Sequence, residues 1–182
     1  MNLMKLLFQM DGTPADDYLL HTIISAHRKV ATEDNISAIS FKASMRGGNT
    51  YAHAIASGIL ATGFRHAPIE QTRVRLFEWG NLKDSLLPIR QMIERGIVIP
   101  GFGHDVIKDM IDPVFQIPFA ALKDETRNHL ATIAAMISEK RGKPIYPNAA
   151  SITAAVAHEL ALPPGGETVI FLIGRSTGWI TL

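Results

Sequence analysis

Apolar residues recur at helical spacing along almost the whole chain, whereas strict alternation of apolar and polar residues is rare. Between Asp16 and Val30, apolar side chains stand three and four residues apart, which is typical of one buried face of a helix. The same pattern predicts further helices with short connections over residues 36–45, 50–62, 68–79, 84–95, 115–140, 148–160 and 167–182. About eight helices without alternating segments predict an all-α fold.

Local signals indicate where several of these helices begin and end. Glycines follow the last periodic residue of two helices, and glycine most readily adopts the left-handed conformation found after a helix. We expect Asp84 or Ser85 to cap the helix 84–95, because both side chains can accept hydrogen bonds from free amides. Residues 98–103, with one proline and two glycines, must form a loop.

Composition narrows the class of protein. The chain has 182 residues, and 47% of them are hydrophobic, which suffices for a core in one domain or two small lobes. A formal net charge of +1 gives no electrostatic reason for a nucleic-acid partner, and no apolar run reaches the roughly 18 residues of a membrane span. The absence of cysteine excludes disulfides, cysteine-ligated zinc and thiol catalysis. We expect a soluble, cytoplasmic protein.

The strongest local motif runs from Ile99 to Lys108 and is followed by an Asp-Pro pair. Two glycines bracket Phe102, and glycines let a backbone approach a ligand without interference from a Cβ atom. A helix beginning at His104 would aim its free amides at an anion or a carbonyl oxygen, with Lys108 one turn away for a phosphate. The plain alternative is an ordinary helix N-terminus that follows a turn and carries a histidine on the surface.

This motif resembles a signature of the citrate synthase superfamily. Three further stretches agree in order and spacing: residues 56–70 resemble a helix and the His-Gly-Gly-Ala segment, 147–151 the Pro-Asn-Val-Asp segment, and 173–180 the Arg-x-x-Gly-Trp segment. Together the four stretches span most of the chain. The resemblance implies an all-α, citrate synthase-like multi-helical fold that is truncated at both ends relative to full-length synthases.

The resemblance also implies roles for single residues. His66 stands where the family has the histidine that stabilises the enolate oxygen of an acyl-CoA thioester. His104 stands where the family has the histidine that polarises the carbonyl of the oxo acid. Arg175, together with Arg65, is expected to bind the carboxylates of the acid. Coenzyme A is expected to lie along the glycine loop, with a lysine near its phosphates, on Ile99, Gly101, Phe102, Gly103 and Lys108.

Two positions depart from the pattern of the family. Its catalytic aspartate, which removes a proton from the methyl group of the thioester, is Ala150 here, and alanine cannot move a proton. No carboxylate lies within four residues of Ala150 in the sequence. The arginine of the family's Asp-Pro-Arg is Val114, so the expected clamp on the substrate carboxylates is reduced. Losing one member of a catalytic set usually lowers the rate by orders of magnitude.

The stretch 143–156 is more similar to the citryl-CoA lyase-like branch of the family than to true synthases. The resemblance implies a protein that breaks or forms a C–C bond of a coenzyme A thioester, citryl-CoA or acetyl-CoA, through an enolate, with His66 and His104 as acid and base. Two alternatives stay open: a catalytically impaired protein that still binds CoA esters, and a subunit or scaffold for a fuller homologue. No metal or redox cofactor is implied.

The resemblance further implies two helical lobes with the site between them. The larger lobe comprises residues 1–95 and 166–182, and the smaller lobe comprises residues 96–165 on the coenzyme A side. Closure of the smaller lobe on the larger one is expected to exclude water from the site. We also expect a homodimer with an isologous helical interface, formed by the helices 36–45 and 50–62.

Overall fold

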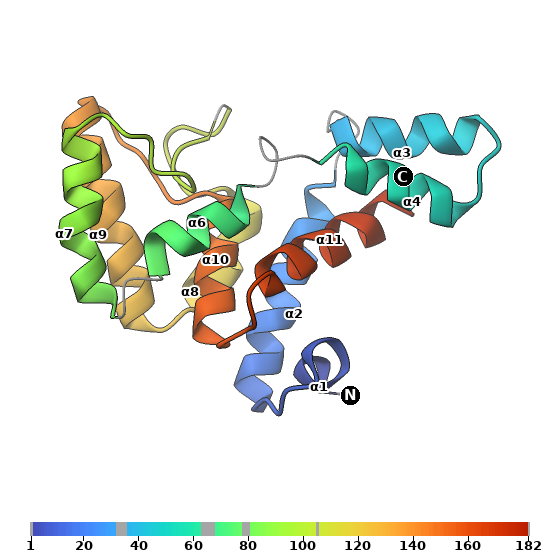
Figure 1. Cartoon of the computed structure of the whole chain (residues 1–182), viewed down its shortest axis with the longest axis horizontal. Helices are drawn as coiled ribbons and strands as arrows, with labels where there is room; N and C mark the ends of the chain where they lie inside the picture. Colours follow the sequence, from blue (N-terminus) through green and yellow to red (C-terminus); the bar gives the residue numbers. More distant parts are fainter. Residues whose placement is uncertain (1, 32–35, 63–67, 78–80, 105, 182) are drawn as a thin grey trace.

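The computed structural model describes residues 2–31, 36–62, 68–77, 81–104 and 106–181. These residues form helices, with one isolated antiparallel bridge between Phe102 and Pro147 and no sheet. The helices in chain order are shown in Figure 1: α1 (Leu3–Phe8), α2 (Pro14–Lys29), α3 (Ile36–Arg46), α4 (Tyr51–Leu60), α6 (Ile69–Phe77), α7 (Leu82–Glu94), the short 3₁₀ helix η1 (Pro113–Phe115), α8 (Gln116–Ala121), α9 (Asp124–Arg141), α10 (Ala149–Glu159) and α11 (Gly166–Trp179). The all-α prediction is confirmed.

Helices α2 and α11 pack against each other at the centre of the fold. A reciprocal capping box between Thr13 and Asp16 sets the start of α2. Where α11 approaches α2, a Cβ atom at Gly174 would lie 2.4 Å from Cβ of His27 and 2.7 Å from the carbonyl oxygen of Ile24. Glycine at this position therefore permits an approach that any side chain would block.

Helices α3 and α4 form a hairpin at the opposite end of the molecule from α7 and α9 (Figure 1). The hairpin has a small apolar core of its own, in which Phe41 and Ala54 pack with Trp179 of α11. At this junction a Cβ atom on Gly58 would lie 2.7 Å from the Trp179 ring, so α4 can lie flat against the ring. The outer faces of the hairpin leave large apolar side chains exposed: Ile36, Ile39, Tyr51 and Leu60.

The other end of the molecule contains two helix pairs, α6 with α10 and α7 with α9. Residues 150–157 are all buried, which shows that neighbouring helices surround α10. Arg73 of α6 fixes the loop before α11. Its guanidinium donates to the carbonyl oxygens of Leu162 and Pro163 and forms an ion pair of 2.6 Å with Glu167. Glu167 is 1% exposed, and the ion pair with Arg73 offsets the cost of burying its side chain.

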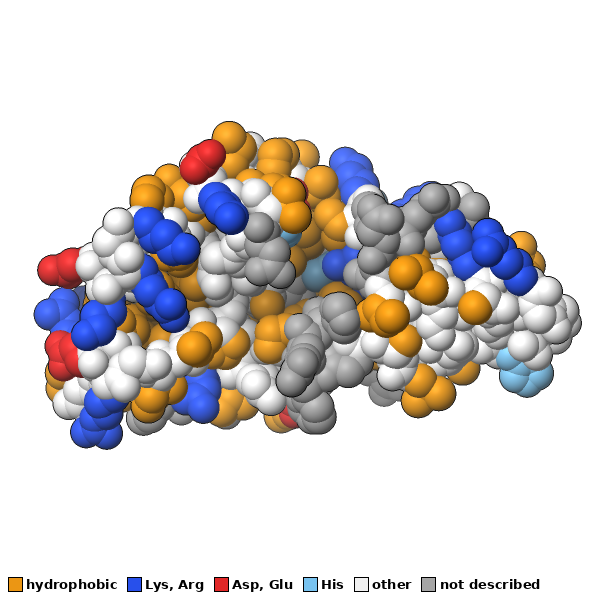
Figure 2. All heavy atoms as spheres, turned by 90° about the horizontal axis from the view of Figure 1, so that it is seen from above, with side chains coloured by type: hydrophobic (Ala, Val, Ile, Leu, Met, Phe, Trp, Pro, Cys, Tyr) orange, Lys and Arg blue, Asp and Glu red, His pale blue; other side chains and the backbone are white. Residues whose placement is uncertain are grey.

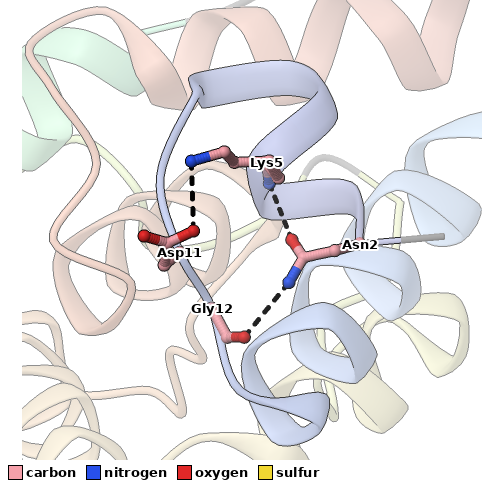
Figure 3. Close-up of polar contacts among 4 residues, drawn as sticks. All are labelled: Asn2, Lys5, Asp11 and Gly12. Atoms are coloured by element: carbon pink, nitrogen blue, oxygen red, sulfur yellow. Dashed lines mark hydrogen bonds and ion pairs between the residues drawn. The ribbon is translucent and has the colours of Figure 1, made fainter.

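Helix α1 is too short for its periodicity to predict it, and the structure shows what holds it beside the start of α2. Asn2 accepts a hydrogen bond from the amide of Lys5 at 2.7 Å and donates to the carbonyl oxygen of Gly12 at 3.1 Å (Figure 3). The Lys5 ammonium lies 3.1 Å from a carboxylate oxygen of Asp11. These contacts fold the segment back on itself, which local sequence spacing alone does not indicate.

The prediction of one helix over residues 115–140 is wrong, because the chain forms η1, α8 and α9 instead. The backbone is extended at Leu122, and the amide of Lys123 donates to Oε1 of Glu159 at 2.7 Å instead of to a carbonyl oxygen of the preceding turn. The predicted cap of α7 is also wrong. Asn81 caps this helix by accepting from the amide of Asp84 at 2.9 Å.

The described helices include none that is long and apolar enough to cross a membrane. The division into a larger lobe of residues 1–95 and 166–182 and a smaller lobe of residues 96–165 stays a prediction. The segments that matter most for the candidate site are the loop between α7 and η1, the end of α9 and the segment before α10.

Candidate functional site

The glycine loop is held against the core at Gly101. The φ angle of Gly101 is +91°, in the left-handed region, and a Cβ atom there would lie 2.7 Å from Cγ2 of Thr72 on α6. The same Cβ atom would lie 2.8 Å from Cβ of Ser151 on α10. Both the backbone conformation and the available space therefore require glycine, which places the loop directly on α6 and α10.

The glycine loop also pairs with the segment before α10. The amide of Gly103 donates to the carbonyl oxygen of Tyr146 at 2.8 Å, and the amide of Asn148 donates to the carbonyl oxygen of Gly101 at 2.9 Å. The side chain of Asn148 donates through Nδ2 to the carbonyl oxygen of Gly103 at 2.8 Å. Its Oδ1 accepts from the amide of Ala150 at 2.9 Å and caps α10. Asn148 thus joins the loop to the first turn of α10.

A cavity of about 650 Å³ opens beside this loop. Its lining comes from the loop and the residues after it, from the end of α9 and from the segment before α10. Figure 2 shows Lys and Arg side chains gathered over the end of the molecule where α7 and α9 lie. Four cationic side chains line the cavity: Lys108, Lys140, Arg141 and Lys143. Asp112 is the one carboxylate among the described residues of the lining.

His104 lies in the lining of this cavity, but no helix begins there, so that part of the prediction is wrong. Instead, Nδ1 of His104 accepts hydrogen bonds from the amides of Val106 at 3.1 Å and Ile107 at 3.0 Å. Because Nδ1 is an acceptor, the neutral imidazole carries its proton on Nε2. The exposed ring therefore presents a donor in a fixed orientation, suited to a carbonyl or enolate oxygen.

Arg175 lies on α11, outside the lining of the cavity. Its Nη1 donates to the carbonyl oxygen of Val30, and its Cζ lies 5.3 Å from the ring centroid of Phe171. Burial lowers the pKa of Arg175 to about 10, while the negative charge of Asp112 acts in the opposite direction. Its Nε is buried and has no hydrogen-bond partner among the described residues.

His27 is a buried histidine to which the sequence interpretation assigns no role. Its Nε2 lies 2.7 Å from Oγ1 of Thr153, which donates its own proton to the carbonyl oxygen of Ala149, so His27 is the donor. Two phenylalanine rings meet the imidazole edge-on at 5.1 Å. Burial, and to a lesser extent the charge of Arg175, lowers the pKa of His27 to about 3. The sequence signal was its position four residues after Ile23, on the apolar face of α2.

Position 150 lies in apolar surroundings. Ala150 is 7% exposed and belongs to a small cluster with Ile69 and Phe171. The second departure from the family's pattern, Val114, is partly buried and packs against the main core. Both replacements thus turn positions expected to be charged into packing positions.

The cavity brings together five of the residues that the sequence singled out: Ile99, Phe102, Gly103, His104 and Lys108. Gly101 packs against α6 and α10 and does not line the cavity, and Arg175 also lies outside the lining. Arg65 and His66 lie outside the described residues. Sequence reasoning missed the cations at the end of α9, since nothing in the local pattern brings them to the glycine loop. Across the described part of the chain, no three metal-ligating side chains form a group.

Comparison with known proteins identifies the fold. The sequence profile described as "Citrate synthase, C-terminal domain" matches residues 2–181. No curated protein matches the chain. Among solved structures, a citryl-CoA lyase from Hydrogenobacter thermophilus is similar, with a TM-score of 0.81 and 22% sequence identity. The match covers 99% of this chain and 73% of that chain.

Two larger proteins contain the same fold. An ATP citrate lyase from Methanosaeta concilii in complex with (3S)-citryl-CoA is similar, with a TM-score of 0.75, 17% identity and coverage of 99% of this chain and 33% of that chain. A citrate synthase from Thermotoga maritima is similar, with a TM-score of 0.76, 20% identity and coverage of 98% of this chain and 50% of that chain. The chain thus spans a third and a half of these two relatives, and the likeness is one of fold.

Proposed function

Because the chain belongs to the citrate synthase C-terminal domain family, we propose that it acts on a coenzyme A thioester and breaks or forms a C–C bond through an enolate. The observation that carries the proposal is the cavity beside the glycine loop, which combines four cationic side chains with the Nε2 donor of His104. The likeness to a citryl-CoA lyase, and to an ATP citrate lyase in complex with citryl-CoA, favours citryl-CoA as the first substrate to test.

The cationic side chains suit the charge of coenzyme A, which carries a diphosphate and a further phosphate on its ribose. Arg141 can form a bidentate pair with a phosphate, and Lys108, Lys140 and Lys143 can act as point charges around it. Isoleucines 97 and 99 line the same cavity and offer an apolar surface to the adenine ring. The cavity of about 650 Å³ falls within the ordinary range of ligand pockets.

His104 suits a role in stabilising negative charge on oxygen. Two backbone amides fix its ring through Nδ1, so Nε2–H need not reorient when charge develops on a bound oxygen. A pre-oriented donor of this kind accelerates enolate formation because its interaction strengthens as the oxygen becomes negative. His66 remains the proposed second histidine, and its contribution is open to the same substitution test.

The proposed binding site for the carboxylate of the acid is Arg175, with Arg65 as a second candidate. The unpartnered Nε of Arg175 supports this role, because a buried donor without a partner is stabilised when a carboxylate binds it. The guanidinium is already held by Val30 and lies over the ring of Phe171. A substrate would therefore meet a positioned cation.

A second candidate function is binding of CoA esters without turnover, either alone or as a subunit of a fuller homologue. The alanine at position 150 favours it, since the side chain there cannot remove a proton. In this case the cationic lining would still hold the phosphates, and His104 would still bind the thioester oxygen. The two candidates differ in turnover and not in ligand.

We propose that the protein is a homodimer that pairs through the hairpin of α3 and α4. The exposed side chains Ile36, Ile39, Tyr51 and Leu60 give this hairpin apolar outer faces. An apolar face on a soluble chain is stabilised when a second copy covers it, and twofold pairing is the simplest closed arrangement. Sedimentation as a monomer at micromolar concentration would contradict this proposal.

The test of the proposed function combines calorimetry with a cleavage assay. The purified protein is titrated with CoA, acetyl-CoA and citrate, and it is then incubated with citryl-CoA while the products are followed. We expect saturable binding of the CoA esters, weakened in the Arg141→Gln and Lys143→Gln variants. The matched control is Lys83→Gln, which removes an exposed cation of α7 that does not line the cavity.

The His104→Ala variant separates the two candidates. If the protein is an enzyme, this variant should bind CoA but cleave citryl-CoA about 10²–10³-fold more slowly, which is the usual effect of removing one oxyanion donor. Binding of CoA esters without any turnover in the unmodified protein would favour the second candidate. Absence of binding by a well-folded protein would exclude both.

A further inference from the structure

Asp112 stands out in the lining of the cavity because of its charge. The other charged side chains of the described lining, apart from His104, are cations: Lys108, Lys140, Arg141 and Lys143. A carboxylate facing a site for a polyanion weakens binding by repulsion, so its presence calls for a function other than binding. Removal of a proton is a function that a carboxylate can supply, and no other described residue of the lining offers a carboxylate for it.

The Asp112 carboxylate is held in place by one of its oxygens. Oδ1 accepts a hydrogen bond from the amide of Val114 at 2.9 Å, which caps η1 at its first residues. The following residue is Pro113, which restricts the backbone next to the carboxylate. Oδ2 has no hydrogen-bond partner among the described residues. One oxygen thus orients the group, and the other is available to a ligand.

Asp112 also lies near the group proposed to bind the carboxylate of the acid. The charge of Asp112 raises the pKa of Arg175 against the larger effect of burial, so carboxylate and guanidinium are electrostatic neighbours. Arg175 does not line the cavity, whereas Asp112 does. Asp112 is therefore the lining residue through which the cavity is electrostatically linked to the Arg175 guanidinium.

Three other described groups, His104, His27 and Glu167, do not offer a free base to the cavity. His104 accepts two backbone amides through Nδ1, so its free nitrogen carries a proton and acts as a donor. His27 is 1% exposed and does not line the cavity. Glu167 is buried in its ion pair with Arg73. Ala150, at the position of the family's aspartate, has no acid or base.

We propose that Asp112 is the general base of this site, an assignment that rests on the proposed function. In cleavage, its carboxylate takes the proton from the hydroxyl group of a 3-hydroxyacyl thioester. The O–H electron pair forms the carbonyl of the oxo acid, and the C–C electron pair becomes the enolate of the thioester. The Asp112 carboxyl group then returns the proton to the enolate carbon, so protons and electrons balance without a further reactant.

The test uses the Asp112→Asn variant, which keeps Oδ1 as the acceptor for the amide of Val114 but cannot act as a base. The matched control is Asp109→Asn, an identical change at an exposed residue of the same segment that does not line the cavity. Two rates are measured in the 182-residue chain: cleavage of citryl-CoA, and uptake of deuterium from D₂O into the methyl group of acetyl-CoA. Calorimetry with CoA checks that each variant still binds.

We expect Asp112→Asn to bind CoA at least as tightly as the unmodified protein, because a repulsive charge is removed, and to lose about 10²–10⁴-fold in both rates. The Asp112→Glu variant should recover part of kcat, since it restores a carboxylate. A purely structural role would instead raise KM and leave kcat and its pH profile unchanged, and this result would overturn the assignment.

Two negative outcomes are distinguishable. If the unmodified protein cleaves and exchanges while Asp112→Asn does so within about threefold of it, the assignment of Asp112 is wrong and the proposed function stands. If the unmodified protein binds CoA but neither cleaves nor exchanges, the proposed reaction and the base are both overturned.

Discussion

The surroundings of His104 and His27 differ sharply, although hydrogen bonds orient both rings. His104 is exposed beside the cavity, and two backbone amides bind its Nδ1, so its Nε2 can reach a ligand. His27 is sealed between α2, α10 and α11, donates to Thr153, and has an Nδ1 without a partner among the described residues. Burial is the main reason that the pKa of His27 falls to about 3.

The contrast shows that histidine can serve two different roles in one fold, packing in the interior and presenting a donor at the surface. In the sealed region, the neutral imidazole fills space between phenylalanine rings and ties α2 to α10. In the loop region, the backbone presents the imidazole to solvent with its donor in a set direction. The sealed region should therefore respond to substitution through stability, and the loop region through ligand binding and rate.

The Gly174→Ala variant should show the largest loss of stability. A Cβ atom at this position would lie 2.4 Å from Cβ of His27 and 2.7 Å from the carbonyl oxygen of Ile24, so α2 and α11 must separate. Overpacking of this kind should lower the free energy of unfolding by about 3 kcal/mol, which denaturation followed by circular dichroism would measure. In the control variant Gly47→Ala, whose nearest contact is 3.4 Å, a change of about 0.5 kcal/mol or less is expected. Equal stability of the two variants would contradict the tight contact.

Acid should destabilise the protein through His27. Because the pKa of His27 is about 3 in the folded state and 6.5 as its reference value, the unfolded chain binds a proton that the folded chain excludes. The stability contributed by this histidine is present above the unfolded pKa and declines as pH falls. From about pH 7 to pH 5 the loss should be about 2 kcal/mol. Burial also lowers the pKa values of His129 and His158, which adds a change of the same sign.

Variants at two histidines isolate this effect. His27→Gln should flatten the dependence of the unfolding free energy on pH, whereas His53→Gln, at an exposed residue of α4, should leave it unchanged. His129 and His158 should leave part of the slope in His27→Gln, but an undiminished slope would show that His27 does not contribute and that the view of a buried neutral imidazole is wrong.

Position 150 lies between the two regions, and Ala150→Asp would test to which of them it belongs. A carboxylate would enter the apolar cluster with Ile69 and Phe171, which is unfavourable, but it would also lie in the first turn of α10, which is favourable. We expect a net destabilisation of about 1–2 kcal/mol, measured by denaturation. Equal or higher stability would mean that the side chain at position 150 is accessible to water, as in the loop region.

The Asn148→Ala variant should have the smallest effect on stability and a separate effect on binding. It removes the cap of α10, at a cost of about 1 kcal/mol, and it also removes the bond to the carbonyl oxygen of Gly103. Because the glycine loop then loses one of its anchors, calorimetry should show weaker binding of CoA. Unchanged affinity together with lower stability would mean that the loop is held by Gly101 and the backbone pairing alone.

Most helices could be predicted from the sequence, because their apolar spacing reflects the core that they face. This holds for α2, α3, α4, α6, α7, α10 and α11. The break before α9 could not, since it depends on the bond from the amide of Lys123 to Glu159, a residue 36 positions later. Helix α1 could not either, because a six-residue segment has too few turns to show a period.

The candidate site was predictable where glycines mark it and unpredictable where distant segments complete it. Two glycines around Phe102 indicated a loop suited to a ligand, and the fold places this loop in a cavity. The cations after residue 139 join the same cavity only through tertiary structure. Asp112 was seen as part of an Asp-Pro pair, but its position as the one carboxylate in the described part of the lining needs the other lining residues to be placed first.

Several hydrogen bonds and one ion pair in the interior of the fold join residues that lie far apart in the sequence. The partners of Arg73 follow it by 89 to 94 residues. Thr153 follows its partner His27 by 126 residues, and Arg175 follows Val30 by 145. A chain that leaves the ribosome from its N-terminus therefore exposes α2 and α6 before their partners exist. Long-range contacts of this kind slow folding, so the centre should close late, once α11 has emerged.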